Sequence, residues 1–225
     1  MLRLGLIGWP VSHSLSPELY AERFGSGCTY ELVETQDFDE AWEVFAGRLD
    51  AVNVTAPFKE AAFVRADFPS GECVLTRSAN LLVKCPEGVR AFNTDYLGVR
   101  SILKDRGLGS GDSALVIGYG GAGRSAAAAC RSLGMSVTVC NRGTSKAEGI
   151  RPLRDIPEAA AQAGIVIYTI PVPVEGISSL SGRTVLEANY RNPSLSGIGC
   201  GYIGGTVWLR AQAEAGFEIL AEHLF

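Results

Sequence analysis

Lys59 and Asp95 stand in two short polar strings that could carry proton-transfer chemistry. The first string is Asn-Val-Thr-Ala-Pro-Phe-Lys over residues 53–59, and the second is Ala-Phe-Asn-Thr-Asp-Tyr-Leu-Gly over residues 91–98. Reduction of a ketone by hydride needs a proton donor at the carbonyl oxygen, and the reverse reaction needs a base. In a lysine–aspartate pair, each charge changes the proton affinity of the other. Beside a dinucleotide site, such a pair would be the acid–base centre of a carbonyl/alcohol oxidoreductase.

Each residue of this pair also has a structural interpretation when it is taken alone. A lysine such as Lys59 is most often a solvated surface residue. Asp95 directly precedes a predicted helix over residues 96–106, where it could serve as the N-cap. Asn53 and Thr55 could cap a strand end in the same way. The proton-transfer interpretation therefore depends on the other motifs of the chain.

A glycine-rich turn, Gly-Tyr-Gly-Gly-Ala-Gly, lies between a predicted strand over residues 114–117 and a predicted helix over residues 123–133. The first glycine permits a tight turn, the second lets the backbone approach a pyrophosphate, and the third allows close helix–strand packing. The N-terminus of the helix supplies N–H donors for phosphates. A tight turn without a ligand is the alternative. The residues expected to contact a dinucleotide are Gly118, Gly120, Gly121, Ala122 and Gly123.

The residues after the next predicted strand, 136–140, favour NADP over NAD. Sites for NAD usually carry an acid about 20 residues past the turn to bind the ribose hydroxyls, whereas this chain has Asn141 and Arg142, with Lys146 nearby. An arginine attracts the 2′-phosphate of NADP and can stack on adenine. The alternative is that Arg142 and Lys146 are solvated surface charges.

Hydrophobic periodicity predicts an α/β fold with two domains. We expect a substrate-binding and catalytic domain over residues 1–96 and a Rossmann-like, doubly wound NADP-binding domain over residues 97–205. A C-terminal helix within residues 206–225 is expected to return to the first domain. Ser16 is expected to be the N-cap of the first helix. Strands are expected at 2–8, 29–33, 51–55, 80–84, 114–117, 136–140, 165–170 and 184–188, and further helices at 38–49, 61–66, 96–106, 123–133, 156–163 and 206–215.

Composition limits the function classes that remain open. The chain has 225 residues and a net charge of −4, so no basic field indicates nucleic acid or membrane binding. The six cysteines show no Cys-x-x-Cys spacing, which predicts free thiols in a reducing compartment. With two histidines, His13 and His223, no metal site is expected. The short apolar N-terminus reads as a strand, so a cytoplasmic protein is expected.

Several strings in collinear order resemble the shikimate dehydrogenase family, from near residue 5 to near residue 217. A resemblance carried by many motifs in the same order is far more specific than any one motif. The strings are Gly8-Trp-Pro-Val-Ser-His-Ser-Leu-Ser-Pro17, Asn53-Val-Thr-Ala-Pro-Phe-Lys59, Ser78-Ala-Asn80, Asn93-Thr-Asp95, Gly118-Tyr-Gly-Gly-Ala122, Asn141-Arg142 and Gly205-x-x-Trp208-Leu209-x-x-Gln212.

The resemblance implies an activity and a substrate site. The family reduces 3-dehydroshikimate to shikimate with NADPH, a step of aromatic amino-acid biosynthesis, and its catalytic pair would be Lys59 and Asp95. Such a protein would act on a small molecule, without nucleic acid or membrane partners, as a monomer or a homodimer. The residues implied in substrate binding are Ser14, Ser16, Thr55, Asn80, Tyr190 and Gln212, and Gly205 is implied at the cofactor.

The chain departs from the family pattern after Tyr190, where a segment of the usual length is replaced by the shorter, glycine-rich residues 191–205. Tyr168, Ile170 and Ala188 are also unusual, and all these changes concern the cofactor side. Two alternatives remain: an NAD-using quinate/shikimate dehydrogenase, and a catalytically weak, ligand-binding relative. Arg142 and Ser14 argue against the first, and the retained pair argues against the second. A methylene-tetrahydrofolate dehydrogenase shares the architecture, but it would not explain the loop over residues 11–17 with Ser14 and Ser16, here called the serine loop.

Overall fold

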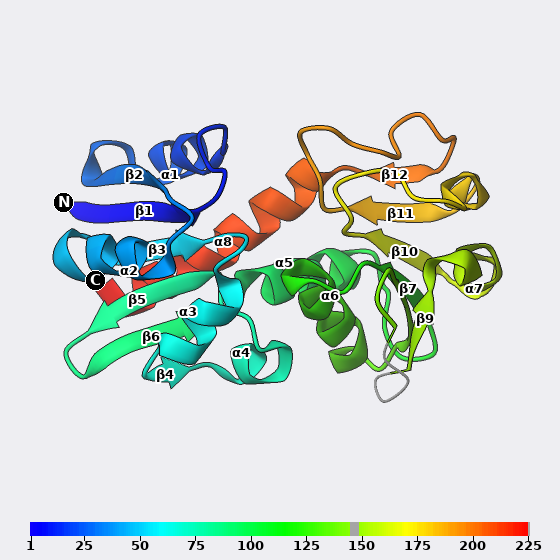
Figure 1. The fold of residues 1–225 in the computed structure, drawn as a ribbon, viewed down its shortest axis with the longest axis horizontal. Helices are drawn as coiled ribbons and strands as arrows, with labels where there is room; N and C mark the ends of the chain where they lie inside the picture. The colour runs from blue at the N-terminus through cyan, green and yellow to red at the C-terminus, as the bar shows by residue number, and fades with distance from the viewer. Residues whose placement is uncertain (145–148, 225) are drawn as a thin grey trace. The chain divides into compact units, whose positions relative to one another are not determined.

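The structure is a computed structural model that describes residues 1–144 and 149–224. The chain divides into two compact units (Figure 1). Unit 1 comprises Met1–Thr94 with Ala213–Phe225, and unit 2 comprises Asp95–Gln212. The boundary expected from the sequence lies between residues 96 and 97, and the returning segment is expected to begin at residue 206. The roles of the two units as substrate and dinucleotide domains stay predictions.

Unit 1 is built on a mixed six-stranded sheet with the order β2-β1-β3-β5-β6-β4. β1 pairs in parallel with β2 and β3, β3 pairs antiparallel with β5, and β5 pairs antiparallel with β6. The carboxyl ends of β1 and β3 therefore share an edge with the start of β5. The strands are β1 (Leu2–Gly8), β2 (Cys28–Glu34), β3 (Ala51–Val54), β4 (Phe68–Pro69), β5 (Leu81–Cys85) and β6 (Gly88–Phe92).

Helices cover both faces of this sheet. Phe45 of α2 (Phe38–Arg48), Ala62 of α3 (Lys59–Arg65) and Cys73 of α4 (Gly71–Thr76) pack in one cluster on one face. On the other face, Tyr20 of α1 (Ser16–Phe24) packs in a cluster with Leu220 of the C-terminal helix α8 (Gly205–Leu224). A short 3₁₀ turn, η1 (Gly25–Gly27), follows α1. The first unit in the sequence is therefore completed by the last helix.

Unit 2 is built on a wholly parallel sheet with the order β12-β11-β10-β7-β8-β9. This order, with helices on both faces, is the doubly wound arrangement that the sequence predicts. The strands are β7 (Ser113–Ile117), β8 (Ser136–Asn141), β9 (Ile150–Pro152), β10 (Ile165–Tyr168), β11 (Thr184–Glu187) and β12 (Gly201–Ile203). The helices are α5 (Thr94–Asp105), α6 (Gly121–Ser132), α7 (Ile156–Gln162) and the 3₁₀ turns η3 (Leu153–Asp155) and η4 (Ile177–Leu180).

Successive side chains along β7 of unit 2 point alternately into two separate hydrophobic clusters. Ala114 and Val116 of β7 point into a cluster with α5, α6 and the start of α8, whereas Leu115 and Ile117 point into a cluster with α7 and η4. A strand with both faces buried reads as a continuous apolar run, which is why Ala-Leu-Val-Ile was recognisable in the sequence.

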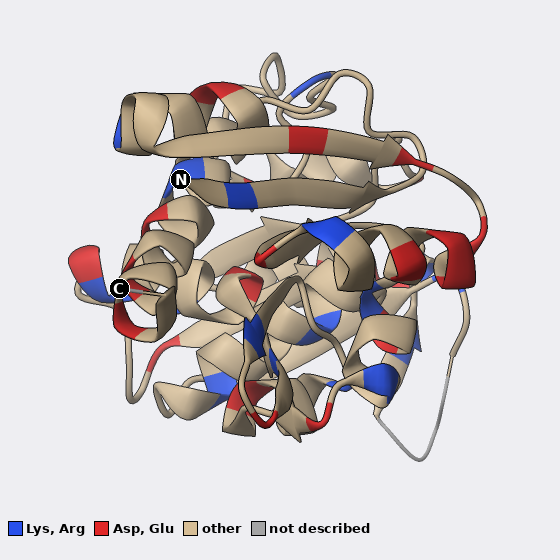
Figure 2. Cartoon of the chain, turned by 90° about the vertical axis from the view of Figure 1, so that its left-hand side faces the viewer, with Lys and Arg blue, Asp and Glu red and all other residues tan. Residues whose placement is uncertain are grey.

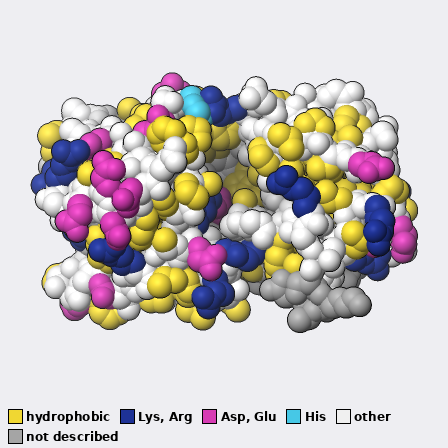
Figure 3. Space-filling view, in the orientation of Figure 1, with side chains coloured by type: hydrophobic (Ala, Val, Ile, Leu, Met, Phe, Trp, Pro, Cys, Tyr) yellow, Lys and Arg dark blue, Asp and Glu magenta, His cyan; other side chains and the backbone are white. Residues whose placement is uncertain are grey.

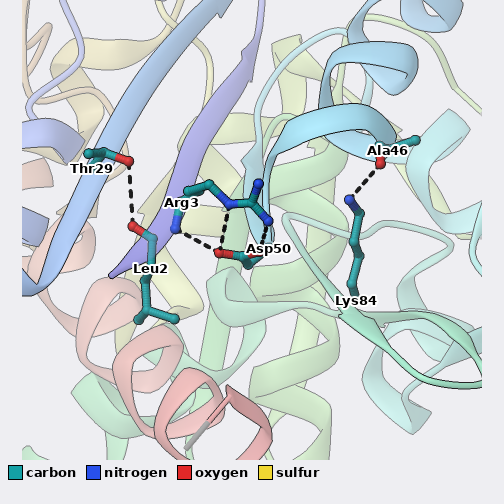
Figure 4. A network of polar contacts seen from close by, with 6 residues as sticks. All are labelled: Leu2, Arg3, Thr29, Ala46, Asp50 and Lys84. Atoms are coloured by element: carbon teal, nitrogen blue, oxygen red, sulfur yellow. Dashed lines mark hydrogen bonds and ion pairs between the residues drawn. The ribbon is translucent and has the colours of Figure 1, made fainter.

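An ion-pair cluster fixes the amino edge of the sheet in unit 1 (Figure 4). The carboxylate of Asp50, just before β3, accepts from the Arg3 backbone N–H at 2.8 Å and pairs with the Arg3 guanidinium at 2.6 Å. Nearby, Lys84 Nζ donates to the carbonyl of Ala46 at 2.6 Å. This edge is opposite the one at which β1 and β3 end, so the cluster serves the fold and lies away from the predicted site strings.

Charged residues of both signs are mixed over the helices and strands that Figure 2 shows. On the face that Figure 3 shows, hydrophobic, acidic and basic side chains are interspersed. The net charge of −4 is consistent with this mixture. Within residues 1–144 and 149–224, no helix combines the length and the apolar composition that crossing a membrane requires.

Candidate functional site

The loop after β1 carries Ser14 and is held by a carboxylate from the neighbouring strand. Glu34 Oε2, at the end of β2, accepts from the backbone N–H groups of Val11 and Ser12, each at 2.7 Å. These two hydrogen bonds hold the pKa of Glu34 below its ordinary value. Ser14 Oγ donates to Ser16 Oγ at 3.1 Å, so the two hydroxyls that the resemblance assigns to the substrate lie side by side.

The prediction that Ser16 is the N-cap of the first helix was wrong. Helix α1 begins at Ser16 itself, and the N-cap position falls to Leu15, with no side-chain capping bond. The backbone N–H of Ser16 donates to Ser14 Oγ at 3.2 Å. Pro17 lies in the first turn, as expected.

The string that ends at Lys59 packs directly against the serine loop. A Cβ atom on Gly8 would lie 2.3 Å from Thr55 Cγ2, so only a glycine lets the two loops approach this closely. Trp9 N–H donates to the carbonyl of Ala56 at 2.9 Å and joins the loops again. Helix α3 then begins at Lys59. The structure therefore brings Ser14, Thr55 and Lys59 to one edge of the sheet in unit 1.

Asn80 connects this edge to the helix that carries Asp95. Its carboxamide Oδ1 accepts from the Thr94 backbone N–H at 2.6 Å and from Thr94 Oγ1 at 3.2 Å. The adjacent residue, Ala79, donates its N–H to the carbonyl of Lys59 at 2.9 Å. One short segment thus hydrogen-bonds both to the backbone of Lys59 and to Thr94, the first residue of α5.

Asp95 follows Thr94 directly and is buried, with 5% of its surface exposed. Since α5 begins at Thr94, Asp95 lies within the first turn of the helix and is not its N-cap. A carboxylate in the first turn interacts favourably with the helix dipole. Asn93, which is 0% exposed, supports the arrangement by donating from Nδ2 to Thr76 Oγ1 and to the carbonyl of Ser78.

The glycine-rich turn has the geometry that the dinucleotide interpretation requires. Gly118 has a φ of 96°, and a Cβ on Gly123 would lie 2.1 Å from the carbonyl oxygen of Gly118. A Cβ on Gly120, by contrast, would meet no atom within 4 Å, so the space beside the second glycine is open. Helix α6 begins at Gly121, two residues earlier than predicted, which places Gly121, Ala122 and Gly123 in its first turn.

The end of β8 lies beside this turn, because the Gly118 N–H donates to the carbonyl of Cys140 at 2.8 Å. Asn141 Nδ2 donates to the carbonyl of Gly143 at 3.2 Å, and Arg142 is exposed. An exposed guanidinium after the second strand is available to an adenosine 2′-phosphate and fits NADP. Lys146 lies outside the described residues.

Tyr190, Gly205 and Gln212 occupy the last part of unit 2. Tyr190 is partly buried and follows β11. A Cβ on Gly205 would lie 2.7 Å from the backbone nitrogen of Tyr190. Gln212 is partly buried in α8, where its backbone nitrogen would be 2.7 Å from a Cβ on Gly98. Close backbone packing therefore fixes both ends of the α8 segment that belongs to unit 2.

The unusual residues Tyr168 and Ile170 are parts of the core. Tyr168 is 0% exposed, and its hydroxyl donates to the carbonyl of Val172 at 2.7 Å. Burial raises the pKa of Tyr168 to about 12, so the hydroxyl stays protonated. Ile170 packs beside Gly118, where a Cβ would lie 2.9 Å from Ile170 Cγ1. These departures from the family pattern thus fill space without adding a reactive group.

Sequence reasoning missed two carboxylates, Glu34 and Glu187, that hold loops carrying predicted site residues. Glu34 holds the serine loop, and Glu187, at the end of β11, is 0% exposed and accepts from Tyr202 Oη at 3.0 Å. Neither belongs to a recognisable string. The weak signal available was the position of each at the carboxyl end of a parallel strand, the edge at which ligands bind in such sheets.

Comparison with known proteins identifies the family. Residues 6–82 match the model of the shikimate dehydrogenase substrate binding domain. The chain is 35% identical to the NADP(+) shikimate dehydrogenase of Thermus thermophilus, covering 80% of this chain and 72% of that one. It is 30% identical over 254 residues to the enzyme of Archaeoglobus fulgidus, covering 97% and 92%. Since this aligned region is longer than the 225 residues here, the relative has residues that this chain lacks.

Solved structures agree in fold. The Thermus thermophilus shikimate 5-dehydrogenase in complex with NADP(H) and shikimate matches with a TM-score of 0.80 and 27% identity, covering 97% of this chain and 93% of that one. Two relatives have this identity and coverage, and both belong to the family that the collinear strings and the two-unit α/β fold indicate. The chain is a member of the shikimate dehydrogenase family.

Proposed function

We propose that the protein is an NADP-dependent shikimate dehydrogenase, which reversibly reduces 3-dehydroshikimate to shikimate. The observation that carries the proposal is the segment at Ala79 and Asn80, which hydrogen-bonds both to the backbone of Lys59 and to Thr94, immediately before Asp95. The Ala79 N–H and the Asn80 carboxamide thereby hold the two polar strings in place. Relatives that cover most of the chain are NADP(+) shikimate dehydrogenases.

The cofactor would be held by unit 2. The first turn of α6, at Gly121, Ala122 and Gly123, presents N–H groups without intrahelical acceptors. The open space beside Gly120 leaves room for a pyrophosphate. Arg142, with Asn141 and Lys146, would receive the 2′-phosphate, and Gly205 would line the site. When bound, NADPH supplies the hydride.

The remaining chemistry belongs to the side chains of the chain. Ser14, Ser16 and Tyr190 would bind the substrate carboxylate. Ring hydroxyls would be bound, or the carboxylate oriented, by Thr55, Asn80 and Gln212. Lys59 and Asp95 would act as the acid–base pair: one proton is delivered to the carbonyl oxygen during reduction and removed from the alcohol during oxidation. The donors fixed by the serine loop orient the substrate before the reaction, which lowers the entropic part of the barrier.

Cellular context belongs to the same proposal. The six cysteines are all free, which fits the reducing conditions of the cytoplasm. The partner is a small molecule, and the protein would act as a monomer or a homodimer, which analytical ultracentrifugation would distinguish.

The first experiment is steady-state oxidation of shikimate, followed at 340 nm with NADP and with NAD, and with quinate as a parallel substrate. We expect turnover of shikimate with NADP to exceed turnover with NAD and with quinate. Comparable use of quinate and NAD would instead assign a quinate/shikimate dehydrogenase. Binding of shikimate by calorimetry without turnover would assign a ligand-binding relative.

A further inference from the structure

Glu187, the last residue of β11, is the starting point because the fold buries its carboxylate completely. The residue is 0% exposed, although it belongs to none of the strings that carry the proposed chemistry. Removing an ionised carboxylate from water is unfavourable unless protein donors replace the lost hydration. A buried carboxylate therefore needs several hydrogen-bond donors from the protein, and these donors show which segments it joins.

Three neutral donors replace the water around Glu187. Its Oε1 accepts from the Ser194 N–H at 2.6 Å, and its Oε2 accepts from the Leu195 N–H at 3.3 Å and from Tyr202 Oη at 3.0 Å. Hydrogen bonds to an ionised acceptor are roughly twice as strong as neutral ones. Burial raises the pKa of Tyr202 to about 12, and the hydrogen bond and charge of Glu187 act in the same direction. Tyr202 therefore remains a donor at neutral pH.

These donors lie at separate points of one connection, residues 188–204, which joins β11 to α8. Ser194 and Leu195 lie midway, and Leu195 is 0% exposed within the core of unit 2. Tyr202 lies in β12, the edge strand that pairs with β11. Glu187 thus ties the middle and the far end of the connection back to the point where it begins.

Two residues proposed to contact ligands lie on the same connection or at its end. Tyr190 lies in a tight turn, in which Asn189 Oδ1 accepts from the Arg191 N–H at 3.1 Å and Asn189 Nδ2 donates to the Asn192 carbonyl at 2.7 Å. Gly205 packs on the start of the connection, since a Cβ there would lie 2.7 Å from the carbonyl oxygen of Ala188. The positions of Tyr190 and Gly205 therefore depend on how the connection is held.

We propose that Glu187 is a positioning residue that holds the shortened connection 188–204 in the form required to bind NADPH beyond its adenosine half. In the sheet of unit 2, β11 lies on the opposite side of β7 from β8, the strand that Arg142 follows, so the connection lies away from the proposed adenosine site. The proposal rests on the proposed function, because it concerns the same cofactor. It assigns Glu187 no contact with substrate or cofactor: the carboxylate acts through the backbone of Ser194 and Leu195 and through Tyr202. The buried carboxylate of Glu187 thus supports the short connection of this chain.

The test uses Glu187→Gln in the full chain, with Glu175→Gln as the control, an exposed carboxylate of the same unit. Glutamine keeps the size of the side chain, but one of its two terminal atoms is a donor and cannot accept from the present N–H and O–H groups. Two ligands are titrated by fluorescence or calorimetry: NADPH, and adenosine 2′,5′-bisphosphate, which carries only the adenosine half. Hydrogen exchange of the peptide that contains residues 194 and 195 is measured in parallel.

For Glu187→Gln we expect about tenfold weaker NADPH binding, unchanged binding of the bisphosphate, and about tenfold faster exchange at residues 194 and 195. A merely global loss of structure would weaken both ligands. Unchanged NADPH binding and exchange in the variant, with normal binding in the wild type, would overturn this proposal alone. A wild-type protein that binds no NADPH and turns over no shikimate would overturn the proposed function as well.

Tyr202→Phe keeps the proposal testable if Glu187→Gln does not fold. It removes one donor and leaves the carboxylate and both backbone bonds, so its effects on NADPH binding and exchange should have the same direction and be about threefold. Faster exchange with intact NADPH binding would show that the anchor exists without serving the cofactor, and would also overturn the proposal.

Discussion

Lys59 is the residue on which the proposed chemistry depends most directly. If it shares proton transfer with Asp95, Lys59→Ala should lower kcat by about 10²-fold or more, because general acid–base catalysis contributes that much. The KM for shikimate should change little, since the serine loop and Asn80 remain.

The control for this variant is Lys104→Ala, which removes an exposed lysine from α5. Steady-state kinetics of shikimate oxidation compare the two variants with the wild type. A kcat near that of the wild type in Lys59→Ala would exclude the role in proton transfer, and an equal loss in both variants would point to a general effect of charge.

Arg142 should decide between the two nicotinamide cofactors. Its exposed guanidinium follows β8, next to the glycine-rich turn. Because only NADPH carries the 2′-phosphate, Arg142→Ala should raise the KM for NADPH by about 10-fold and leave the KM for NADH almost unchanged. Arg154→Ala, at an exposed position of η3, is the matched control. Equal losses for both cofactors would contradict the 2′-phosphate contact.

At the scale of elements, Glu34 links β2 to the loop that presents Ser14 and Ser16. Its two backbone donors lower the pKa of Glu34, so the ionised form holds the loop. The stabilisation is complete above the ordinary pKa of 4.5 and is lost as the pH falls through the lowered value in the folded protein. Glu34→Gln should therefore weaken shikimate binding about fivefold at pH 7.

Calorimetric titration with shikimate between pH 7 and pH 3.5 tests this expectation. The wild-type affinity should approach that of Glu34→Gln at the acid end, because protonation and the substitution both remove the negative charge of the acceptor. Glu31→Gln, on the same strand, removes a carboxylate that pairs with Arg48 instead and should bind shikimate normally. If Glu34→Gln binds as the wild type does at pH 7, the loop does not depend on this carboxylate.

Asp50 joins the amino edge of β1 to β3 through Arg3 and serves stability alone. Both side chains are partly exposed, so solvent screens the pair, and Asp50→Ala should lower the free energy of unfolding by about 1 kcal/mol. The hydrogen bond from Arg3 is the main cause of the lowered pKa of Asp50. The difference should therefore shrink as the pH falls below the ordinary value of 3.8.

Urea denaturation at pH 7 and pH 3 measures this difference, and kcat serves as the control because the pair lies at the edge opposite the serine loop. A variant as stable as the wild type at pH 7 would mean that the pair contributes nothing net. A reduced kcat with unchanged stability would assign Asp50 a role beyond the fold.

Elements with a full hydrophobic period were predictable, and the shortest ones were not. The buried run of β7 and the amphipathic α2 were found because their patterns extend over several residues. The two-residue β4 and the three-residue strands β9 and β12 are too short to show alternation, and pairing with neighbours alone creates them. For the last helix, the pattern over residues 206–215 left open whether residues 217–225 extend it or pack nearby. The helix continues through Gly216, where a Cβ would lie 3.3 Å from Tyr20 Oη.

The residues of the candidate site also fall into two groups, those that the sequence predicted and those that it did not. Residues in strings, such as Lys59 and Gly118, were visible because motifs fix their spacing. The carboxylates of Glu34 and Glu187 were not visible, because their roles arise from backbone donors that come close only when the strands pair. A side chain that binds loop backbone leaves no local pattern in the sequence.

At the scale of the whole molecule, the two ligands should protect different segments of the chain. In hydrogen exchange, adenosine 2′,5′-bisphosphate should slow exchange at the glycine-rich turn, residues 118–124, in unit 2. Shikimate should slow exchange at residues 9–17 and 53–60 in unit 1. At 100 times Kd, either ligand would add about 2.7 kcal/mol of stability to the state that it binds.

Exchange measured by mass spectrometry with each ligand separately tests this division, and residues 81–85 of the buried β5 are an internal reference. Protection of the glycine-rich turn by shikimate alone, with none at the serine loop, would contradict the assignment of the substrate to Ser14 and Ser16.

Helix α8 has a consequence for the order in which the chain folds during synthesis. Unit 2 is one continuous stretch, Asp95–Gln212, and can close as soon as that stretch has left the ribosome. Unit 1 needs Leu220 to cover Tyr20, Leu4 and Leu81 on one face of its sheet. Domains usually fold in the order of their synthesis. Here the core that Leu4, Leu81 and Tyr20 share with Leu220 is expected to be completed only after α8 has been made, later than the continuous stretch of unit 2.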